Sequence, residues 1–296
     1  MPQPARRALA PWMLLFFSWP LAAADEVRVA AGTVEEQRYT DASFGGLTVE
    51  LQLTGDAVKD VKALRTKVKS ARDDRGTNLY KPSKEDRAAD FQDFSPNTRP
   101  GPSFKLSTPP RDASTIDVSG EVELFIPSRD PDTKLTVEGF LNRLDKPVAS
   151  PALKAAKAEI TPLSAAAYKA RQAGNKPKKE DIIAEGKKHG ASEEEIKQAL
   201  AMIEAFSSLG GEEPSENSVL LETKDPDGRI ISIDVVGADG KDLHSGSRGS
   251  QGGRETKLTK IDLSSKPPAD AALLVTMRTN KSVVTVPVNL KGVSLP

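Results

Sequence analysis

Residues 151–211 read PALKAAKAEITPLSAAAYKARQAGNKPKKEDIIAEGKKHGASEEEIKQALAMIEAFSSLGG, and this is the one long stretch of the 296-residue chain with a helical pattern. On both sides of it, apolar and polar residues alternate with a period of two, which is typical of β-strands that bury one face. The stretch therefore divides the chain. We predict a mainly β protein with two antiparallel β-sandwich domains, residues 25–150 and 217–296, and a three-helix segment between them.

Three helices are expected within this segment. Thr161-Pro162 has the residues of a helix start, a hydroxyl at the N-cap and a proline at the first helical position, and Gly174 would end that helix. Residues 178–190 carry acidic side chains in the first turn and basic ones in the last, which suits the helix dipole. Ser192 and Glu195 have the spacing of a capping box for the third helix. The apolar stripe of this third helix consists of Ile196, Leu200, Ile203 and Phe206.

The second and third helices should form a hairpin with a short turn. A basic helix followed by an amphipathic one could indicate DNA binding, but Glu193–Glu195 would repel phosphate, so we expect no nucleic-acid partner. Two placements of the hairpin remain open: it packs its apolar stripe on a neighbouring sheet, or it stands out as an arm. His189 would end a helix, where the dipole favours it, and no ligand role is assigned to it.

The segment before the helices shows the alternation most clearly in two runs, residues 47–53 and 116–126, the second of which continues across Gly120. A weaker strand is expected from Val61 to Val68. Half-polar strands of this kind belong to antiparallel sheets. Residues 94–110 contain five prolines and are expected to form a long surface loop, because proline cannot donate to an inner strand.

The segment after the helices reads as short strands separated by turns. DPDGR at 225–229 and GADGK at 237–241 are hairpin signals, because Asp-Gly pairs favour turns with positive φ. SGSRGSQGG at 245–253 is expected to be a flexible hairpin loop, and residues 273–277 and 284–290 should form the final hairpin. Short strands without a helix in a segment of this size are typical of an immunoglobulin-like or fibronectin-type sandwich, a resemblance of architecture only.

The first 24 residues have the organisation of a secretory signal peptide. Arg6 and Arg7 form a positive start, residues 9–21 are apolar, and Ala22-Ala23-Ala24 offers a cleavage site before Asp25. The apolar run is short and interrupted by prolines, so it is not expected to span a membrane. We therefore expect a periplasmic or secreted protein, cleaved near Ala24, that has no transmembrane segment afterwards.

The composition excludes several kinds of catalysis. The chain has no cysteine, so disulfides and thiolate chemistry are excluded. Its two histidines, His189 and His244, are too few for a multi-histidine zinc site, and no motif of a serine hydrolase, nucleotide-binding loop or zinc protease is present. The predicted mature chain has 40 basic and 42 acidic residues, because cleavage removes two of the 42 arginines and lysines. This near-balance gives no electrostatic reason to expect a polyanionic partner.

One stretch partly resembles a calcium-binding loop. TKDPDGRIISID, residues 223–234, places Asp225 and Asp227 before Gly228 and ends in Asp234. Thr223 stands where such loops begin with an aspartate, the last position is Asp where they have Glu, and the flanking segments are predicted strands. These three aspartates are therefore weak metal candidates, and the simpler interpretation is a solvated Asp-Gly turn.

Together these patterns predict an exported, non-enzymatic binding or scaffolding protein of the bacterial cell envelope. Its expected partner is another envelope protein, and neither a catalytic residue nor a cofactor is assigned. Two alternatives remain: an envelope hydrolase that uses carboxylates or a serine and lysine pair, and a calcium-dependent binding module.

Overall fold

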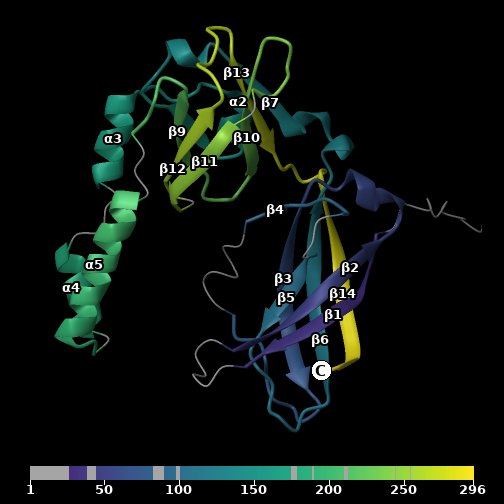
Figure 1. Ribbon diagram of the computed structural model, residues 1–296. Helices are drawn as coiled ribbons and strands as arrows, with labels where there is room; N and C mark the ends of the chain where they lie inside the picture. Colours follow the sequence, from purple (N-terminus) through teal and green to yellow (C-terminus); the bar gives the residue numbers. More distant parts are fainter. Residues whose placement is uncertain are drawn as a thin grey trace, which may run out of the picture.

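The computed structural model is mainly β, with antiparallel sheets throughout its described part (Figure 1). The structure describes residues 27–38, 45–82, 90–97, 101–174, 179–188, 190–209, 213–243, 245–253 and 255–296. The predicted signal peptide therefore lies outside the described residues, as do both histidines. Within these ranges, no helix is long and apolar enough to cross a membrane.

Two sheets make up the first β unit. The three-stranded sheet has the order β1-β2-β5, and the four-stranded sheet has the order β14-β6-β3-β4. Their bounds are β1 Arg28–Gln37, β2 Gly46–Thr54, β3 Ala63–Asp73, β4 Gln92–Asp93, β5 Ser103–Leu106, β6 Thr115–Phe125 and β14 Val283–Ser294. Side chains from both sheets share one buried core, whose largest fully buried members include Phe104, Leu47 and Leu124.

Two more sheets make up the second β unit. One has the order β10-β13-β7 and the other the order β11-β12-β9-β8. Their bounds are β7 Lys134–Glu138, β8 Glu159–Pro162, β9 Ser218–Lys224, β10 Ile230–Val236, β11 Ser245–Gly252, β12 Lys257–Leu263 and β13 Ala272–Met277. A separate core joins these sheets and includes Leu221, Ile261 and Leu273.

The alternation in the first segment correctly located its principal strands. Leu47, Val49 and Leu51 of β2 are buried while their neighbours are more exposed, and β6 repeats this pattern. Each strand therefore turns one face to the core, as a period of two requires.

Strand pairing joins segments from before and after the helices at two places. β7 lies before the helices but pairs with β13 of the second unit, and β14 lies after them but pairs with β6 of the first. The predicted final hairpin is therefore wrong, because its two strands belong to different units. Alternation specifies which face of a strand is buried, but it does not specify the neighbouring strand.

The two links between the units are hydrogen-bonded to each other. Ile126 after β6 donates its amide to the carbonyl of Ser282 before β14, at 2.8 Å. The hydroxyl of Thr279 donates to the carboxylate of Asp130 at 2.6 Å, and Asp130 and Ser282 are buried. Buried polar groups require such partners, so these bonds hold the two crossings together.

Aromatic and cationic side chains meet where the units adjoin. The guanidinium of Arg65, on β3, lies 4.9 Å from the centre of the Phe91 ring, and that of Arg278, after β13, lies 5.8 Å from it. Arg278 also donates to the carbonyl of Gly228 at 2.7 Å. These contacts connect the first unit with the turn that precedes β10.

The described residues between β7 and β9 contain four α-helices. They are α2 Pro151–Ala155, α3 Ala165–Gly174, α4 Lys179–Lys188 and α5 Glu193–Leu209. Earlier in the chain, the described residues include the short 3-10 helices η1 Asp56–Asp60, η2 Pro127–Arg129, η3 Pro131–Thr133 and η4 Phe140–Asn142. Figure 1 shows α3 beside the second β unit and the α4 and α5 pair beyond α3. Tyr168 of α3 packs on Leu220 and Leu258 of the sheet that contains β9 and β12.

The predicted capping box is confirmed, whereas the predicted helix start at Thr161-Pro162 is wrong. The hydroxyl of Ser192 accepts from the amide of Glu195 at 3.3 Å, and the Glu195 carboxylate accepts from the amide of Ser192 at 2.7 Å. Thr161-Pro162 instead ends β8, which pairs with β9, and Ser164 caps α3. Because β8 is an edge strand, it tolerates a proline there, and tertiary pairing overrides the local capping pattern.

Three predicted connections also differ. The predicted loop at 94–110 contains β5, and the predicted loop at 245–253 contains β11, although both strands lie at sheet edges. The DPDGR turn joins β9 to β10, which lie in different sheets, so it is not a hairpin. Glycine and proline indicate turns reliably, but edge strands accept the same residues when only one side is paired.

Candidate functional site

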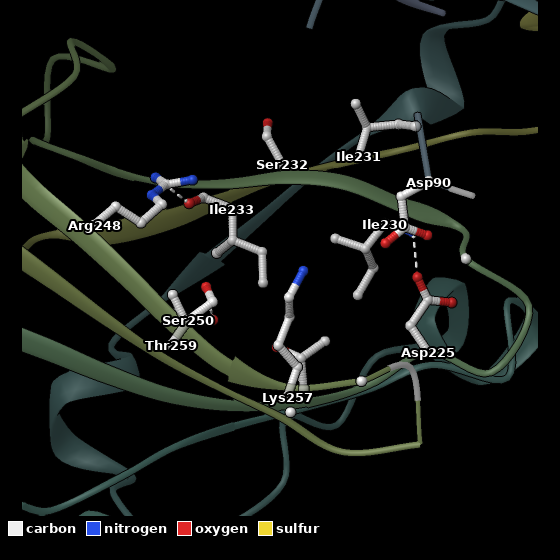
Figure 2. A pocket seen from close by; sticks show the side chains of 14 residues that line it. Asp90, Asp225, Ile230, Ile231, Ser232, Ile233, Arg248, Ser250, Lys257 and Thr259 are labelled. Atoms are coloured by element: carbon white, nitrogen blue, oxygen red, sulfur yellow. Dashed lines mark hydrogen bonds between the residues drawn. The ribbon is translucent and has the colours of Figure 1, made fainter. Parts of the chain in front are cut away.

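A cavity of about 340 Å³ lies in the second β unit, between β10 and β11. These are edge strands of the two sheets, so the space between the sheets is open along this side. Figure 2 shows the lining side chains, which come from β9, β10, β11, β12, the turn after β9, and Asp90 of the first β unit. Farther inside, side chains of both sheets pack together in the second core. The cavity lies at the edge of that core, where the space between the sheets is not filled by side chains.

One wall of the cavity is polar. Lys257 and Thr259 line it from β12, where alternation places them on the same face as Ile261 and Leu263 of the second core. Ser250, opposite Thr259 on β11, lies 3.2 Å from it, hydroxyl to hydroxyl. The inward face of β12 therefore changes from apolar to polar along its length, and the cavity begins where it changes.

The opposite wall is apolar. Ile230 and Ile233 of β10 line the cavity, are half-buried and pack against the second core. They face the same side although they are three residues apart, because the pairing of β10 with β13 has a bulge between Ile230 and Ser232. Figure 2 shows the side chains of Ile231 and Ser232 on the other side of the β10 ribbon from Lys257, although both residues also contribute to the lining.

The turn after β9 forms one end of the cavity. Asp225 is 8% exposed, and its two carboxylate oxygens accept from the amides of Arg229 and Ile230, each at 2.7 Å. Gly228 has a φ of 59°, which a residue with a side chain adopts only with strain. Asp90 of the first β unit lies beside Asp225 at this end (Figure 2). The turn is therefore fixed by its own hydrogen bonds.

Arg248 bridges the two edge strands toward the other end. Its guanidinium, which comes from β11, donates to the carbonyl of Ile233 at 2.8 Å and contacts the carboxylate of Asp234 at 3.1 Å, both on β10. These bonds connect the otherwise separate sheets across the open side. The charge of Arg248 is thereby compensated by Asp234.

The amine of Lys257 differs from the other charged groups of the cavity. Figure 2 shows it rising between Ile233 and Ile230 into the open space. No hydrogen bond or ion pair joins it to another side chain within the part of the chain that the structure describes. An ammonium group between two apolar side chains interacts with water through the open mouth of the cavity.

The three aspartates of the predicted calcium loop do not come together as a ligand set. Asp225 is bonded to turn amides, Asp227 is exposed and Asp234 is paired with Arg248. Among the described residues, no group of three or more acidic, histidine or cysteine side chains could hold a metal ion. The loop stretch nevertheless contributes to the cavity, through Thr223, Asp225 and the isoleucines of β10.

A second group of serine, lysine and aspartate lies on the other face of β12. Ser218 and Ser247 donate to the carboxylate of Asp262 at 2.6 and 2.9 Å, and Lys260 lies 3.0 Å from it. Burial tends to raise the pKa of Asp262, but these hydroxyl and ammonium groups hold its pKa below the ordinary value. The carboxylate is thus a weak base that is held in place by these three groups.

Of the cavity residues, the sequence indicated only those from 223–234, and for a different reason. Ser250 and Arg248 lie in the run at 245–253, which was expected to be a flexible loop, and Lys257 was not indicated, although the alternation of β12 places it in line with two core positions. No protein-family model matches the chain, and neither the curated proteins nor the solved structures contain a significant match. The function must therefore be inferred from these residues.

Proposed function

We propose that this protein is an exported, non-enzymatic binding or scaffolding protein of the bacterial cell envelope, whose partner is another envelope protein. In this proposal the two β units are β-sandwich domains with an immunoglobulin-like arrangement, which present their edge strands and loops for recognition. The signal-peptide pattern of residues 1–24 supports export. Fold alone does not identify a partner, so the evidence for one comes from the residues at the site.

The observation that carries the proposal is the open side between β10 and β11. Edge strands have unpaired backbone groups, which are suited to recognising an extended segment of another protein. The side chains around the opening are held by mutual contacts, such as that between Arg248 and Asp234. The hydroxyl of Ser250 has another hydroxyl, that of Thr259, as its partner. Side chains that are held in place by such contacts support a binding role.

Two measurements test this proposal. Cell fractionation followed by N-terminal sequencing should find the mature chain outside the cytoplasm and beginning at Asp25. A photo-crosslinking amino acid at Ile231, on the edge strand β10, should give a covalent adduct with one envelope protein in living cells. The same amino acid at Thr285, which is exposed on β14, provides the control. A cytoplasmic, uncleaved chain, or equal adducts from both positions, would refute the proposal.

One observation favours the alternative of an envelope hydrolase. Ser250 and Lys257 line the same cavity, and a lysine can serve as the general base for a serine nucleophile. Such a serine should react with a fluorophosphonate probe, and Ser250→Ala should abolish the labelling. If the wild-type protein is not labelled, a serine and lysine pair at this cavity is excluded as the catalytic group, and the binding proposal is unaffected.

A further inference from the structure

The position of Lys257 extends the inference beyond a protein partner. We propose that the cavity between β10 and β11 binds a small organic carboxylate, which places its anionic group at the amine of Lys257 and its hydrocarbon part against Ile230 and Ile233. The two proposals have separate readouts, the affinity for a carboxylate and the covalent adduct formed from position 231, so either one can fail while the other holds.

Lys257 lies at the start of β12 and is exposed, but alternation places it on the face of the strand that turns inward farther along. Thr259, Ile261 and Leu263 follow it on the same face, and the last two are buried at 1% and 6% exposure. A core position of this kind is ordinarily apolar, because a buried unpaired charge is costly. Here the sheets stay apart at the margin, so the amine reaches the space between them and remains hydrated.

The charges of the cavity favour an anion at this one point. Arg248 is already paired with Asp234, and the carboxylate of Asp225 is already bonded by two amides. The cation without a partner among the described residues that line the cavity is Lys257. Asp90 and Asp225 lie at the end beyond Ile230 (Figure 2), so repulsion would keep a carboxylate near the amine and away from that end.

The two walls require a ligand with both polar and apolar parts. The isoleucines of β10 offer a half-buried hydrocarbon surface, whereas Ser250 and Thr259 place hydroxyls on the opposite side. A volume of about 340 Å³ corresponds to roughly eleven water molecules at about 30 Å³ each. That is the lower end of ligand-pocket sizes, and it suits a short chain such as hexanoate better than a long lipid.

Calorimetric titration of the purified mature protein with hexanoate tests the site. We expect saturable binding at one site, and hexan-1-ol, which has the same chain without the charge, should bind at least about tenfold more weakly. Lys257→Met should reduce hexanoate affinity by a similar factor. Lys241→Met is the matched control, because Lys241 is an exposed lysine of the second unit in the turn after β10, and it should leave the affinity unchanged.

The competing explanation is that Lys257 is an inward-facing charge that prevents association between sheet edges. In that case Lys257→Met would self-associate in size-exclusion chromatography, and the wild-type protein would not bind hexanoate. That result overturns the proposal, as does equal binding of hexanoate by the wild type and a folded Lys257→Met or Lys257→Gln protein. Circular dichroism identifies folded variants, and two substitutions are compared so that a folding defect in one leaves the test intact.

Discussion

Gly120 interrupts the apolar alternation of β6, and the structure explains why a glycine stands there. A Cβ atom at this position would lie 2.5 Å from the backbone oxygen of Lys67 on β3 and 2.8 Å from the ring of Phe104 on β5. β3 and β6 pair in one sheet, whereas β5 belongs to the facing sheet. The glycine therefore permits a close approach both within the sheet and between the sheets.

Gly120→Ala should destabilise the protein by a predictable amount. The new methyl group would be about 0.9 Å too close to the Lys67 oxygen, relative to the 3.4 Å at which ordinary contact begins, and this neighbour is backbone. Overpacking of this kind typically costs about 1–3 kcal/mol, and loss of glycine's unfolded-state freedom returns about 0.5–1 kcal/mol. We expect a net loss of up to about 2.5 kcal/mol, with roughly 2–4 °C of Tm lost for each kcal/mol.

Urea and thermal unfolding of purified protein measure this difference. Gly249→Ala is the matched control, because Gly249 also lies in a strand but a Cβ there would meet nothing within 4 Å. That variant should be neutral or more stable by about 0.4–1 kcal/mol. If Gly120→Ala is as stable as Gly249→Ala, the close approach of β3, β5 and β6 is refuted.

Three further substitutions test packing, capping and an ion pair. Phe104→Ala removes a ring that is 1% exposed and should lower the unfolding free energy by about 3–5 kcal/mol in urea titration. Ser192→Ala removes the N-cap of α5 and should weaken its first turn by about 1 kcal/mol, which hydrogen exchange of the α5 amides would detect. Burial would raise the pKa of Glu123, but hydrogen bonds and charges from Lys67 and Arg65 hold that pKa below its ordinary value of 4.5. This stabilisation is complete above the unfolded pKa and is lost as the pH falls through the folded pKa, so Glu123→Gln should flatten the decline of Tm in acid.

Local patterns predicted the strands and caps of this chain better than they predicted its connections. The alternation at 47–53 and the capping box at Ser192 depend on neighbouring residues, and both are found in the structure. The pairing of β14 with β6 joins residues far apart in the sequence. Many strands in the chain have an apolar face, so alternation alone does not select β6 as the neighbour of β14. The alternating pattern was therefore also compatible with a final hairpin, which the structure does not contain.

Edge strands were the second source of error. Thr161-Pro162 has a strong helix-start pattern, and the serine and glycine run at 245–253 has low strand propensity, yet both segments contribute to edge strands. In each case a neighbouring strand with a buried apolar face, β9 or β12, supplies the hydrogen bonds and the packing. Tertiary context thus outweighs propensity where one partner strand is already well formed.

The cavity could have been recognised from the sequence by a different use of alternation. In the strand KLTKIDL, Ile261 and Leu263 lie on the face that is buried in the second core. Lys257 and Thr259 lie on the same face, because side chains two residues apart in a strand point to the same side. A lysine in line with core positions either finds a counter-charge, is excluded from the core by opening of the sheets, or destabilises the fold. No counter-charge reaches Lys257 within the described residues, and the sheets are open at this margin. The residue that interrupts the apolar pattern therefore marks the place where the second core ends and a ligand can enter.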